Sequence, residues 1–289
     1  MSLCIVNPVS GNGRSMKIYK KYLKHTKLFR TEYHNHVYDY FMDNLEKIKG
    51  FEIIISVGGD GNIHQIINCL IRHKLDIPII QIPTGSGNGL FHSICYERNL
   101  IKPNMSDALR ILDERKVKKL DIMKVNDTLY SFLAISWGFI SDCDLKTEWL
   151  RCLGPFRYDI GSIINIIRKK SYKGTLEVNG SKISGNFVYL WVTNLTYPSI
   201  ECKVAPDAKC NDGLIHISYI TEPITRYEML KLALQFSSGK FLKHPKVNYV
   251  TCKEFKLTIQ EGDIVIDGER SSYKEIEVKI HKEKVKILG

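Results

Sequence analysis

The sequence predicts an α/β plus all-β fold, with an N-terminal parallel-sheet α/β domain over residues 1–115 and a C-terminal antiparallel β-sandwich domain over residues 116–289. Up to about residue 113, apolar runs typical of strands alternate with helical stretches, an order typical of parallel sheets with right-handed crossovers. Beyond residue 116, short apolar runs are separated by turn signals such as Asn179-Gly180, which indicates antiparallel strands. A chain of 289 residues is long enough for two such domains.

The first domain is expected to alternate strands and helices throughout. We expect strands at residues 3–7, 28–33, 53–57 and 77–82, and helices at 14–25, 37–49, 63–70, 88–95 and 105–114. The run Ile53-Ile54-Ile55 is apolar and β-branched, which is typical of a buried strand. Asn104 or Ser106 can cap the last of these helices.

The second domain is expected to be mainly β, with two helical interruptions. We expect strands at residues 120–125, 129–138, 174–178, 186–194, 214–220, 255–260, 264–267 and 276–280. The helices are expected at about 158–170 and 226–236.

Three predicted strands of the first domain are each followed by a glycine-rich loop. The loops are residues 7–13 (Asn-Pro-Val-Ser-Gly-Asn-Gly), 58–61 (Gly-Gly-Asp-Gly) and 83–89 (Pro-Thr-Gly-Ser-Gly-Asn-Gly). A strand, a glycine turn and a helix N-terminus form an anion site, because backbone N–H groups point outward and glycine lets a phosphate approach. One such loop alone reads as a tight turn, but in an open α/β sheet three would converge at the carboxyl ends of the strands. Together they predict a phosphate site.

A carboxylate stands inside the middle loop. Asp60 would repel a bare phosphate, so its presence indicates a metal, a hydroxyl to orient or a proton to abstract. A carboxylate within hydrogen-bond reach of a primary hydroxyl can accept its proton while the bond to phosphorus forms. We therefore predict that Asp60 is a catalytic base.

These loops, in this order, resemble the lipid kinases that share the diacylglycerol-kinase catalytic fold. Further stretches resemble the sphingosine kinase branch: residues 136–145, 151–157, 205–206, 212–213 and 266–269. The resemblance runs from residue 3 to beyond residue 269. It implies an ATP- and Mg²⁺-dependent kinase with its active site in a cleft between the two domains.

The resemblance also implies which residues bind the nucleotide. Thr31 matches a position near the adenosine, Arg151 and Arg157 a pair that reaches the triphosphate, and residues 267–269 (Asp-Gly-Glu) a motif that closes the site. The alternative for the two arginines is a solvated helix face, and the alternative for Asp-Gly-Glu is a solvated hairpin turn. The residues assigned to nucleotide binding are Asn7, Ser10, Gly11, Thr31, Gly58, Gly59, Gly61, Gly85, Ser86, Gly87, Asn88, Arg151, Arg157, Asp267, Gly268 and Glu269. No protein metal ligand is assigned.

Two carboxylates follow the stretch Ser136-Trp137-Gly138-Phe139. Asp142 and Asp144 beside a lipid pocket suit a cationic amine, because burying that charge requires a partner. Ala134 lies where sphingosine kinases have a head-group serine, and Ser136, on the same strand face, is expected to replace it. Diacylglycerol has no amine, so these residues favour a sphingoid base. Gln65 stands where the family usually has glutamate.

The sequence therefore predicts an ATP-dependent kinase that phosphorylates a sphingoid base at its primary hydroxyl. The alternatives are a diacylglycerol or ceramide kinase, an NAD kinase with a similar Gly-Gly-Asp-Gly turn, and a lipid- or nucleotide-binding regulator without catalysis. Gln65 is the main support for the regulator, and Asp60 speaks against it.

Composition bears on the location and partners of the chain. The net charge of +11 is compatible with binding to nucleic acid, an anionic membrane or phosphate-rich ligands. No basic run alternates with aromatic residues as in a single-strand binder, so no nucleic-acid partner is expected. The eight cysteines form no Cys-x-x-Cys and are expected to be reduced. With neither a signal peptide nor an apolar run of membrane-spanning length expected, we predict a cytoplasmic protein that binds membranes peripherally. Residues 163–167 are apolar and 168–170 are basic, which fits either a core helix or a membrane-docking helix.

Overall fold

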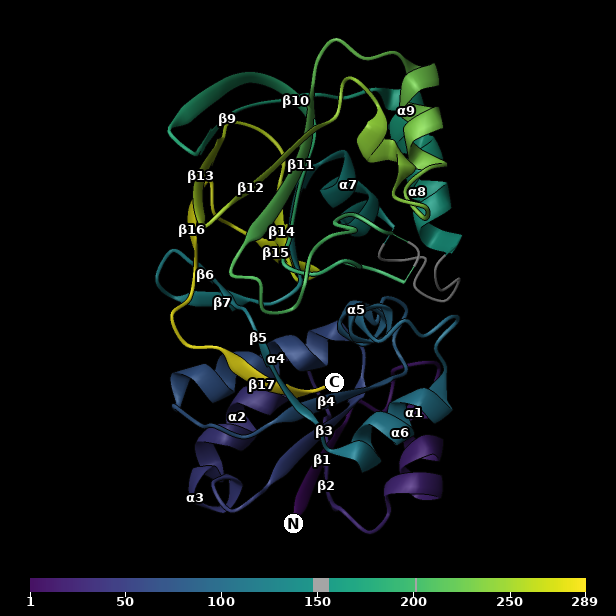
Figure 1. The fold of residues 1–289 in the computed structure, drawn as a ribbon, viewed down its shortest axis with the longest axis vertical. Coiled ribbons are helices and arrows are strands. Elements are labelled where there is room, and N and C mark those ends of the chain that lie inside the picture. The colour runs from purple at the N-terminus through teal and green to yellow at the C-terminus, as the bar shows by residue number, and fades with distance from the viewer. Residues whose placement is uncertain (148–155, 201) are drawn as a thin grey trace.

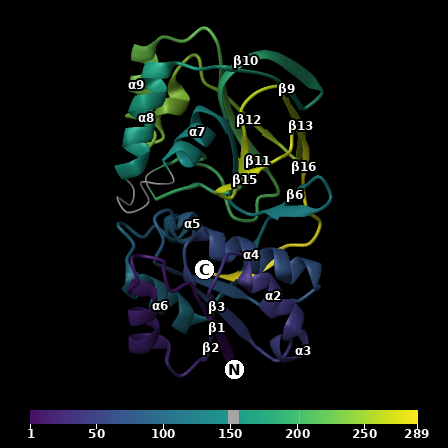
Figure 2. The same ribbon diagram turned by 180° about the vertical axis from the view of Figure 1, so that it is seen from behind.

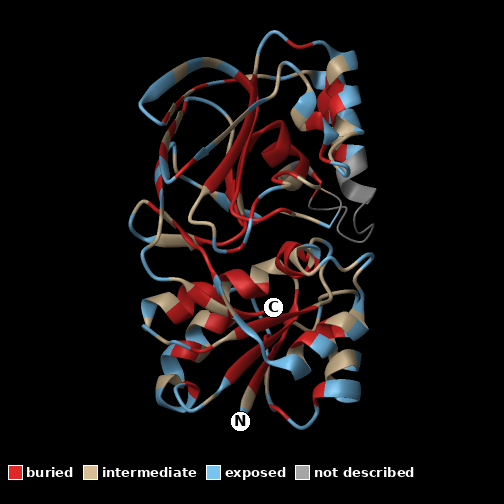
Figure 3. Cartoon of the chain, viewed as in Figure 1, coloured by how far each residue is buried: buried red, intermediate tan, exposed pale blue. Residues whose placement is uncertain are grey.

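The computed structural model describes residues 1–147, 156–200 and 202–289, without the side chains of residues 146 and 156–159. Two domains are stacked along the long axis, each built on its own sheet (Figure 1). Buried residues line both sheets, and the helices of the first domain carry exposed residues on their outer faces (Figure 3). This arrangement confirms the predicted fold class.

The first domain is a six-stranded sheet in the order β2-β1-β3-β4-β17-β5. Its central strands pair in parallel, and β3 is buried along its whole length because helices cover both faces. The strands are β1 (Ser2–Val6), β2 (Lys27–Arg30), β3 (Ile53–Gly58), β4 (Ile79–Pro83), β5 (Val117–Leu120) and β17 (Val285–Leu288). The helices are α1 (Arg14–Ile18), a π-helix (Tyr19–Leu23), α2 (His36–Asp43), α3 (Leu45–Ile48), α4 (Asp60–Arg72), α5 (Gly89–Glu97) and α6 (Met105–Glu114).

Local chemistry accounts for several helix boundaries. Helix α6 begins with a capping box, in which Asn104 accepts from Ser106 N and Asp107 accepts from Asn104 N. The single helix expected over residues 37–49 is two helices, because the chain leaves helical geometry at Asn44.

Eleven strands of the second domain form one continuous sheet with antiparallel pairing. Strand β10 pairs with β9 through its first half and with β8 and β11 through its second half, so the sheet divides there. Apolar side chains from both parts share one core. The strands are β6 (Met123–Val125), β7 (Leu129–Ser131), β8 (Ala134–Gly138), β9 (Tyr172–Val178), β10 (Ser181–Thr193), β11 (Ile215–Thr221), β12 (Asn248–Cys252), β13 (Glu254–Ile259), β14 (Ile264–Ile266), β15 (Glu269–Ser271) and β16 (Glu275–Ile280).

Helices cover the other face of this sheet. They are α7 (Phe139–Lys146), α8 (Phe156–Arg168), α9 (Arg226–Ala233) and a 3-10 helix (Lys240–Lys243). A second apolar cluster lies between them and the sheet and includes Phe139, Tyr189 and Met229. Helix α7 was not predicted. It starts directly after β8 at Gly138, which has a φ of +79°. A Cβ on Gly138 would lie 2.6 Å from the Val188 carbonyl oxygen, so only glycine fits there.

Two strands beyond residue 115 belong to the first sheet. Strand β17 at the C-terminus pairs in parallel with β4 and antiparallel with β5. The division of the chain at residue 115 therefore differs from sheet membership, and as a domain boundary it stays a proposal. The chain passes between the domains after β5 and again before β17. Lys284 Nζ on the second of these segments lies 2.6 Å from Asp121 Oδ1 on the first.

Candidate active site

The three glycine-rich loops meet at the carboxyl ends of β1, β3 and β4. Thr84 Oγ1 donates to Ser10 Oγ at 2.9 Å, which joins the first loop to the third. A Cβ on Gly11 would lie 2.6 Å from the Thr84 carbonyl oxygen, and a Cβ on Gly85 would lie 2.5 Å from Gly59 Cα. These glycines therefore let the loops contact one another. Glycine is needed here for loop packing, in addition to the phosphate approach expected from the sequence.

Asparagine side chains shape two of these loops. Asn7 Oδ1 accepts from Val9 N at 3.2 Å directly after β1. Asn88, with a φ of +50°, accepts from Gly85 N at 2.9 Å and donates to Gly85 O at 2.7 Å. Such local side-chain bonds fix a turn in one conformation. Two of the three loops are thus held by hydrogen bonds of their own asparagine side chains.

Asp60 lies at the centre of this arrangement, as the first residue of α4. Its Oδ1 accepts from Gln81 Nε2 at 3.1 Å and from Leu90 N at 3.4 Å, and its Oδ2 accepts from Gly89 N at 3.0 Å. A carboxylate has about four acceptor positions, so Oδ2 keeps one that no donor from the described residues occupies. Burial raises the pKa of Asp60, against the hydrogen bonds from Gly89, Gln81 and Leu90 that lower it.

Gln81 was not singled out from the sequence. It is 1% exposed in the apolar strand β4, and its Oε1 accepts from Phe91 N at 2.9 Å. The available signal was one amide inside the run Ile79-Ile80-Gln81-Ile82, because a buried polar side chain needs partners.

Asp267 is a buried link between the domains. Its side chain is 0% exposed, and Oδ2 accepts from His64 Nδ1 on α4 at 2.8 Å. The carboxylate also accepts from Ser131 Oγ and from the backbone N–H groups of residues 132–134. The carboxylate of Asp267 is therefore enclosed by donors from the protein, and its predicted part in closing a nucleotide site stays a proposal.

The rest of the Asp-Gly-Glu motif is more open. Glu269 is exposed, its Oε2 lies 3.6 Å from His34 Nε2, and its Oε1 would lie 3.9 Å from a Cβ on Gly61. Gly268 has a φ of +88°, a conformation that favours glycine. The structure thus brings Glu269 to the loop that carries Asp60.

Thr31, Arg151 and Arg157 are the remaining residues that were predicted to bind the nucleotide. Thr31 is buried at the end of β2, where its N and Oγ1 both bond to the Val6 carbonyl. Arg151 lies outside the described residues, and Arg157 lies in α8 with its side chain undescribed.

The predicted lipid-binding residues lie on the helix-covered side of the second sheet. Asp142 is in the first turn of α7, and the Tyr172 hydroxyl donates to its Oδ2. Burial is the main cause that raises the pKa of Tyr172, and the hydrogen bond to Asp142 raises it further. Ser136 is buried on β8 and alternates with Ile135 and Trp137 of the other core, so it faces the helices, while Asp144 is half-buried.

A narrow apolar cavity lies in the same layer, beneath α9. Its lining residues are Phe139, Val188, Tyr189, Ile220, Ile224, Met229, Leu232 and Phe236. Phe139 is the first residue of α7, the helix that also carries Asp142 and Asp144.

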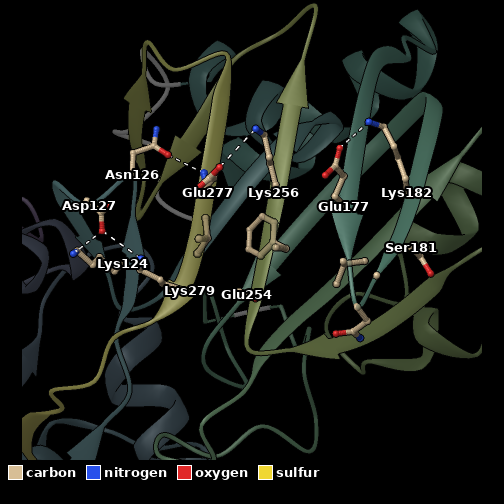
Figure 4. A pocket seen from close by; sticks show the side chains of 15 residues that line it. Lys124, Asn126, Asp127, Glu177, Ser181, Lys182, Glu254, Lys256, Glu277 and Lys279 are labelled. Carbon is tan, nitrogen blue, oxygen red and sulfur yellow. Dashed lines mark hydrogen bonds and ion pairs between the residues drawn. The ribbon is translucent and has the colours of Figure 1, made fainter.

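A larger surface hollow on the second sheet shares no residue with the loops (Figure 4). Its charges pair across neighbouring strands, with Lys182 at 2.9 Å from Glu177 and Lys256 at 3.6 Å from Glu277. Ion pairs of this kind are typical of a solvated sheet face. The hollow is not a candidate site.

The described part of the chain contains no group of three or more His, Cys, Asp or Glu side chains that could hold a metal ion. Among the described residues no helix is long and apolar enough to cross a membrane. Cys4, Cys69, Cys95, Cys143, Cys210 and Cys252 form no disulfide.

Comparison with known proteins agrees with this architecture. Residues 1–125 match the diacylglycerol kinase catalytic domain, and residues 134–289 match the YegS C-terminal NAD kinase beta sandwich-like domain. The chain is 25% identical to sphingosine kinase 1 of Rattus norvegicus, over 96% of this chain and 88% of that protein. It is 28% identical to sphingoid long chain base kinase 4 of Schizosaccharomyces pombe, over 77% of this chain and 59% of that protein.

Solved structures show the same fold. A diacylglycerol kinase from Bacillus anthracis superposes with a TM-score of 0.69 at 15% identity, over 99% of this chain and 96% of that chain. The fold, the order of the loops and both family matches lead to one conclusion. The chain belongs to the lipid kinase family in which a diacylglycerol kinase catalytic domain is followed by a YegS-type C-terminal domain.

Proposed function

We propose that this lipid kinase transfers the γ-phosphoryl group of ATP to the primary hydroxyl of a sphingoid base, which gives the 1-phosphate. The observation that carries the proposal is the place of Asp60. Its carboxylate lies where three glycine-rich loops meet and keeps one acceptor position on Oδ2. A buried carboxylate with a raised pKa is suited to take a proton.

Each part of the site has a role in this reaction. The loops around Asn7, Gly59 and Gly85 would hold the phosphates with backbone N–H groups, with Mg²⁺ supplying charge neutralisation. Asp60 Oδ2 accepts the proton of the lipid hydroxyl, the hydroxyl oxygen forms a bond to the γ-phosphorus, and the bond from that phosphorus to the bridging oxygen breaks. ADP leaves with the bridging electron pair, and Asp60 later returns its proton to solvent.

The acidic residues of α7 support a lipid that carries an amine. Asp142 and Asp144 lie next to the apolar layer that would take the alkyl chain, and an ammonium group that leaves water needs a carboxylate beside it. The names of two relatives, a sphingosine kinase and a sphingoid long chain base kinase, agree with this choice. Diacylglycerol and ceramide offer no ammonium group.

Peripheral membrane binding is part of the proposal, because the substrate is dissolved in a bilayer. Ile163 and Ile167 of α8 are 55% and 64% exposed, while Asn165 and Ile166 face inward. The exposed basic residues Lys170 and Lys173 lie just beyond the end of α8. Helix α9 lies beside α8 (Figures 1 and 2), tied to it by a bond from Arg226 Nε to the Ile167 carbonyl at 3.0 Å. An exposed apolar face with basic neighbours is typical of docking to an anionic bilayer.

A phosphotransfer assay with sphingosine, dihydrosphingosine, ceramide and diacylglycerol in parallel tests the function. We expect phosphorylation of the two free bases, dependent on ATP and Mg²⁺, and little of the other lipids. Preference for diacylglycerol would mean that the carboxylates of α7 do not select the substrate. Lipid or nucleotide binding without turnover would instead support the regulator.

A further inference from the structure

We propose that Gln81 is a positioning residue, which holds the carboxylate of Asp60 in the orientation that leaves Oδ2 open to the substrate hydroxyl. This inference rests on the proposed function, in which Asp60 is the base. Gln81 does not reach the reacting atoms. It acts through Asp60, to which it donates a hydrogen bond from Nε2 to Oδ1 at 3.1 Å.

The hydrogen bonds of Gln81 fix the direction of its amide. Phe91 N on α5 is a donor and must face the oxygen, Oε1, at 2.9 Å. The nitrogen then faces Asp60, so the amide cannot turn over without setting two donors against each other. Gln81 is 1% exposed on β4, in register with Ser56 of β3. Its backbone is therefore held by the sheet and its side chain by α5.

The two carboxylate oxygens of Asp60 accept different numbers of hydrogen bonds. Gln81 and Leu90 N occupy Oδ1, while Oδ2 has Gly89 N alone. Without the amide, Oδ1 would keep only the 3.4 Å bond from Leu90, and the carboxylate could rotate about its Cβ–Cγ bond. The amide also favours the charged form, since a donated bond stabilises a carboxylate more than a carboxylic acid.

Other charges near Asp60 act in the opposite direction. Asp267 raises the pKa of Asp60, although its own carboxylate is bonded to His64. Glu269 lies near Gly61 and is also acidic. The donors that counter burial and these charges are the N–H groups of Gly89 and Leu90 and the amide of Gln81. Of these donors, only the amide of Gln81 belongs to a side chain, so it is the one that a substitution can remove.

Two variants separate positioning from a purely structural role. Gln81→Met keeps a similar volume and loses both bonds. Gln81→Glu keeps an oxygen for Phe91 N, loses the donor to Asp60 and adds an acidic group beside it. If Gln81 merely holds α5, Gln81→Met should lower the stability of the protein without moving the acidic limb of the kcat profile. If Gln81 positions Asp60, glutamate should be worse than methionine.

The first measurement is the pH dependence of kcat with dihydrosphingosine. We expect Gln81→Met to lower kcat about tenfold and to move the acidic limb upward by about one pH unit, with the KM for ATP nearly unchanged. Gln81→Glu should move that limb further. The exposed Gln260 provides a matched control, since Gln260→Met makes the same chemical change outside the site. ATP also titrates in this range, equally for all four proteins.

The second measurement does not need activity. The pKa of Asp60 is read from the carboxyl ¹³C resonance of aspartate-labelled protein, assigned through Asp60→Asn. A higher value in Gln81→Met supports the positioning role even if wild type phosphorylates no sphingoid base, an outcome that would defeat only the proposed function. The same value in wild type and Gln81→Met, or an unshifted acidic limb in an active Gln81→Met enzyme, would overturn the inference.

Discussion

His64 Nδ1 donates a 2.8 Å hydrogen bond to Asp267 Oδ2, and this buried pair joins helix α4 of the first domain to the end of β14 in the second. Asn68, one turn further along α4, bonds to Tyr130 in both directions, with Nδ2 to the carbonyl at 2.8 Å and Oδ1 from the N–H at 3.1 Å. Because Asp60 begins the same helix, the orientation of the second domain and the position of the proposed base are linked through α4.

Removal of the Asp267 carboxylate should destabilise the protein strongly. Asp267→Ala leaves His64, Ser131 and three backbone N–H groups without their acceptor, so we expect the free energy of unfolding to fall by about 3–5 kcal/mol. Urea denaturation measures this loss. Asp263→Ala is the matched control, because Asp263 pairs with the exposed Arg270 and should cost about 1 kcal/mol or less. Equal losses in the two variants would show that the buried link contributes no more than a surface pair.

Replacement of the proposed base should affect turnover and little else. We expect Asp60→Asn to keep the fold and the affinity for ATP, and to lower kcat by roughly a hundredfold or more, the range typical of a lost general base. Steady-state kinetics and nucleotide titration check this. Near-normal turnover in a folded Asp60→Asn protein would rule out Asp60 as the base.

The two halves of the proposed site should respond to different substrates. The single variants Arg151→Ala and Arg157→Ala should each mainly raise the KM for ATP, because guanidinium groups bind phosphates. Asp144→Ala should mainly raise the KM for the lipid, because it removes a carboxylate from the proposed ammonium site. The KM of both substrates is measured for each variant. The opposite pattern would mean that the assignment of the two groups is reversed.

Membrane docking should depend on α8 and its basic end. Ile163→Ser combined with Ile167→Ser should reduce sedimentation with anionic vesicles, as should glutamine at Lys169, Lys170 and Lys173, each of which contributes on the order of 1 kcal/mol at low salt. Activity on detergent-solubilised substrate should change little. Ile101→Ser is the matched control, since Ile101 is also highly exposed but lies in the first domain. Equal binding by all these proteins, at low and high salt, would mean that the lipid enters elsewhere.

Sequence patterns were enough to predict the architecture where the local signal is strong. The β-branched run of β3, the strand–loop–helix alternation and the capping residues before α6 each act within a few residues, so they can be read along the chain. Helix α7 and strands β5, β12, β15 and β17 were missed. Strand β17 lies between β4 and β5 in the first sheet because the chain returns from the second domain at residues 285–288, a long-range pairing that no local pattern encodes.

The sequence by itself determined that three phosphate-compatible loops end three strands and that one of them carries a carboxylate, because glycine spacing and residue type are local properties. The tertiary structure decided what those residues do. It placed Gly11 and Gly59 against neighbouring loops, enclosed Asp267 among protein donors and turned Gln81 toward Asp60. Each of these depends on the approach of segments far apart in the chain, where burial and hydrogen-bond partners are set by packing and cannot be read from spacing.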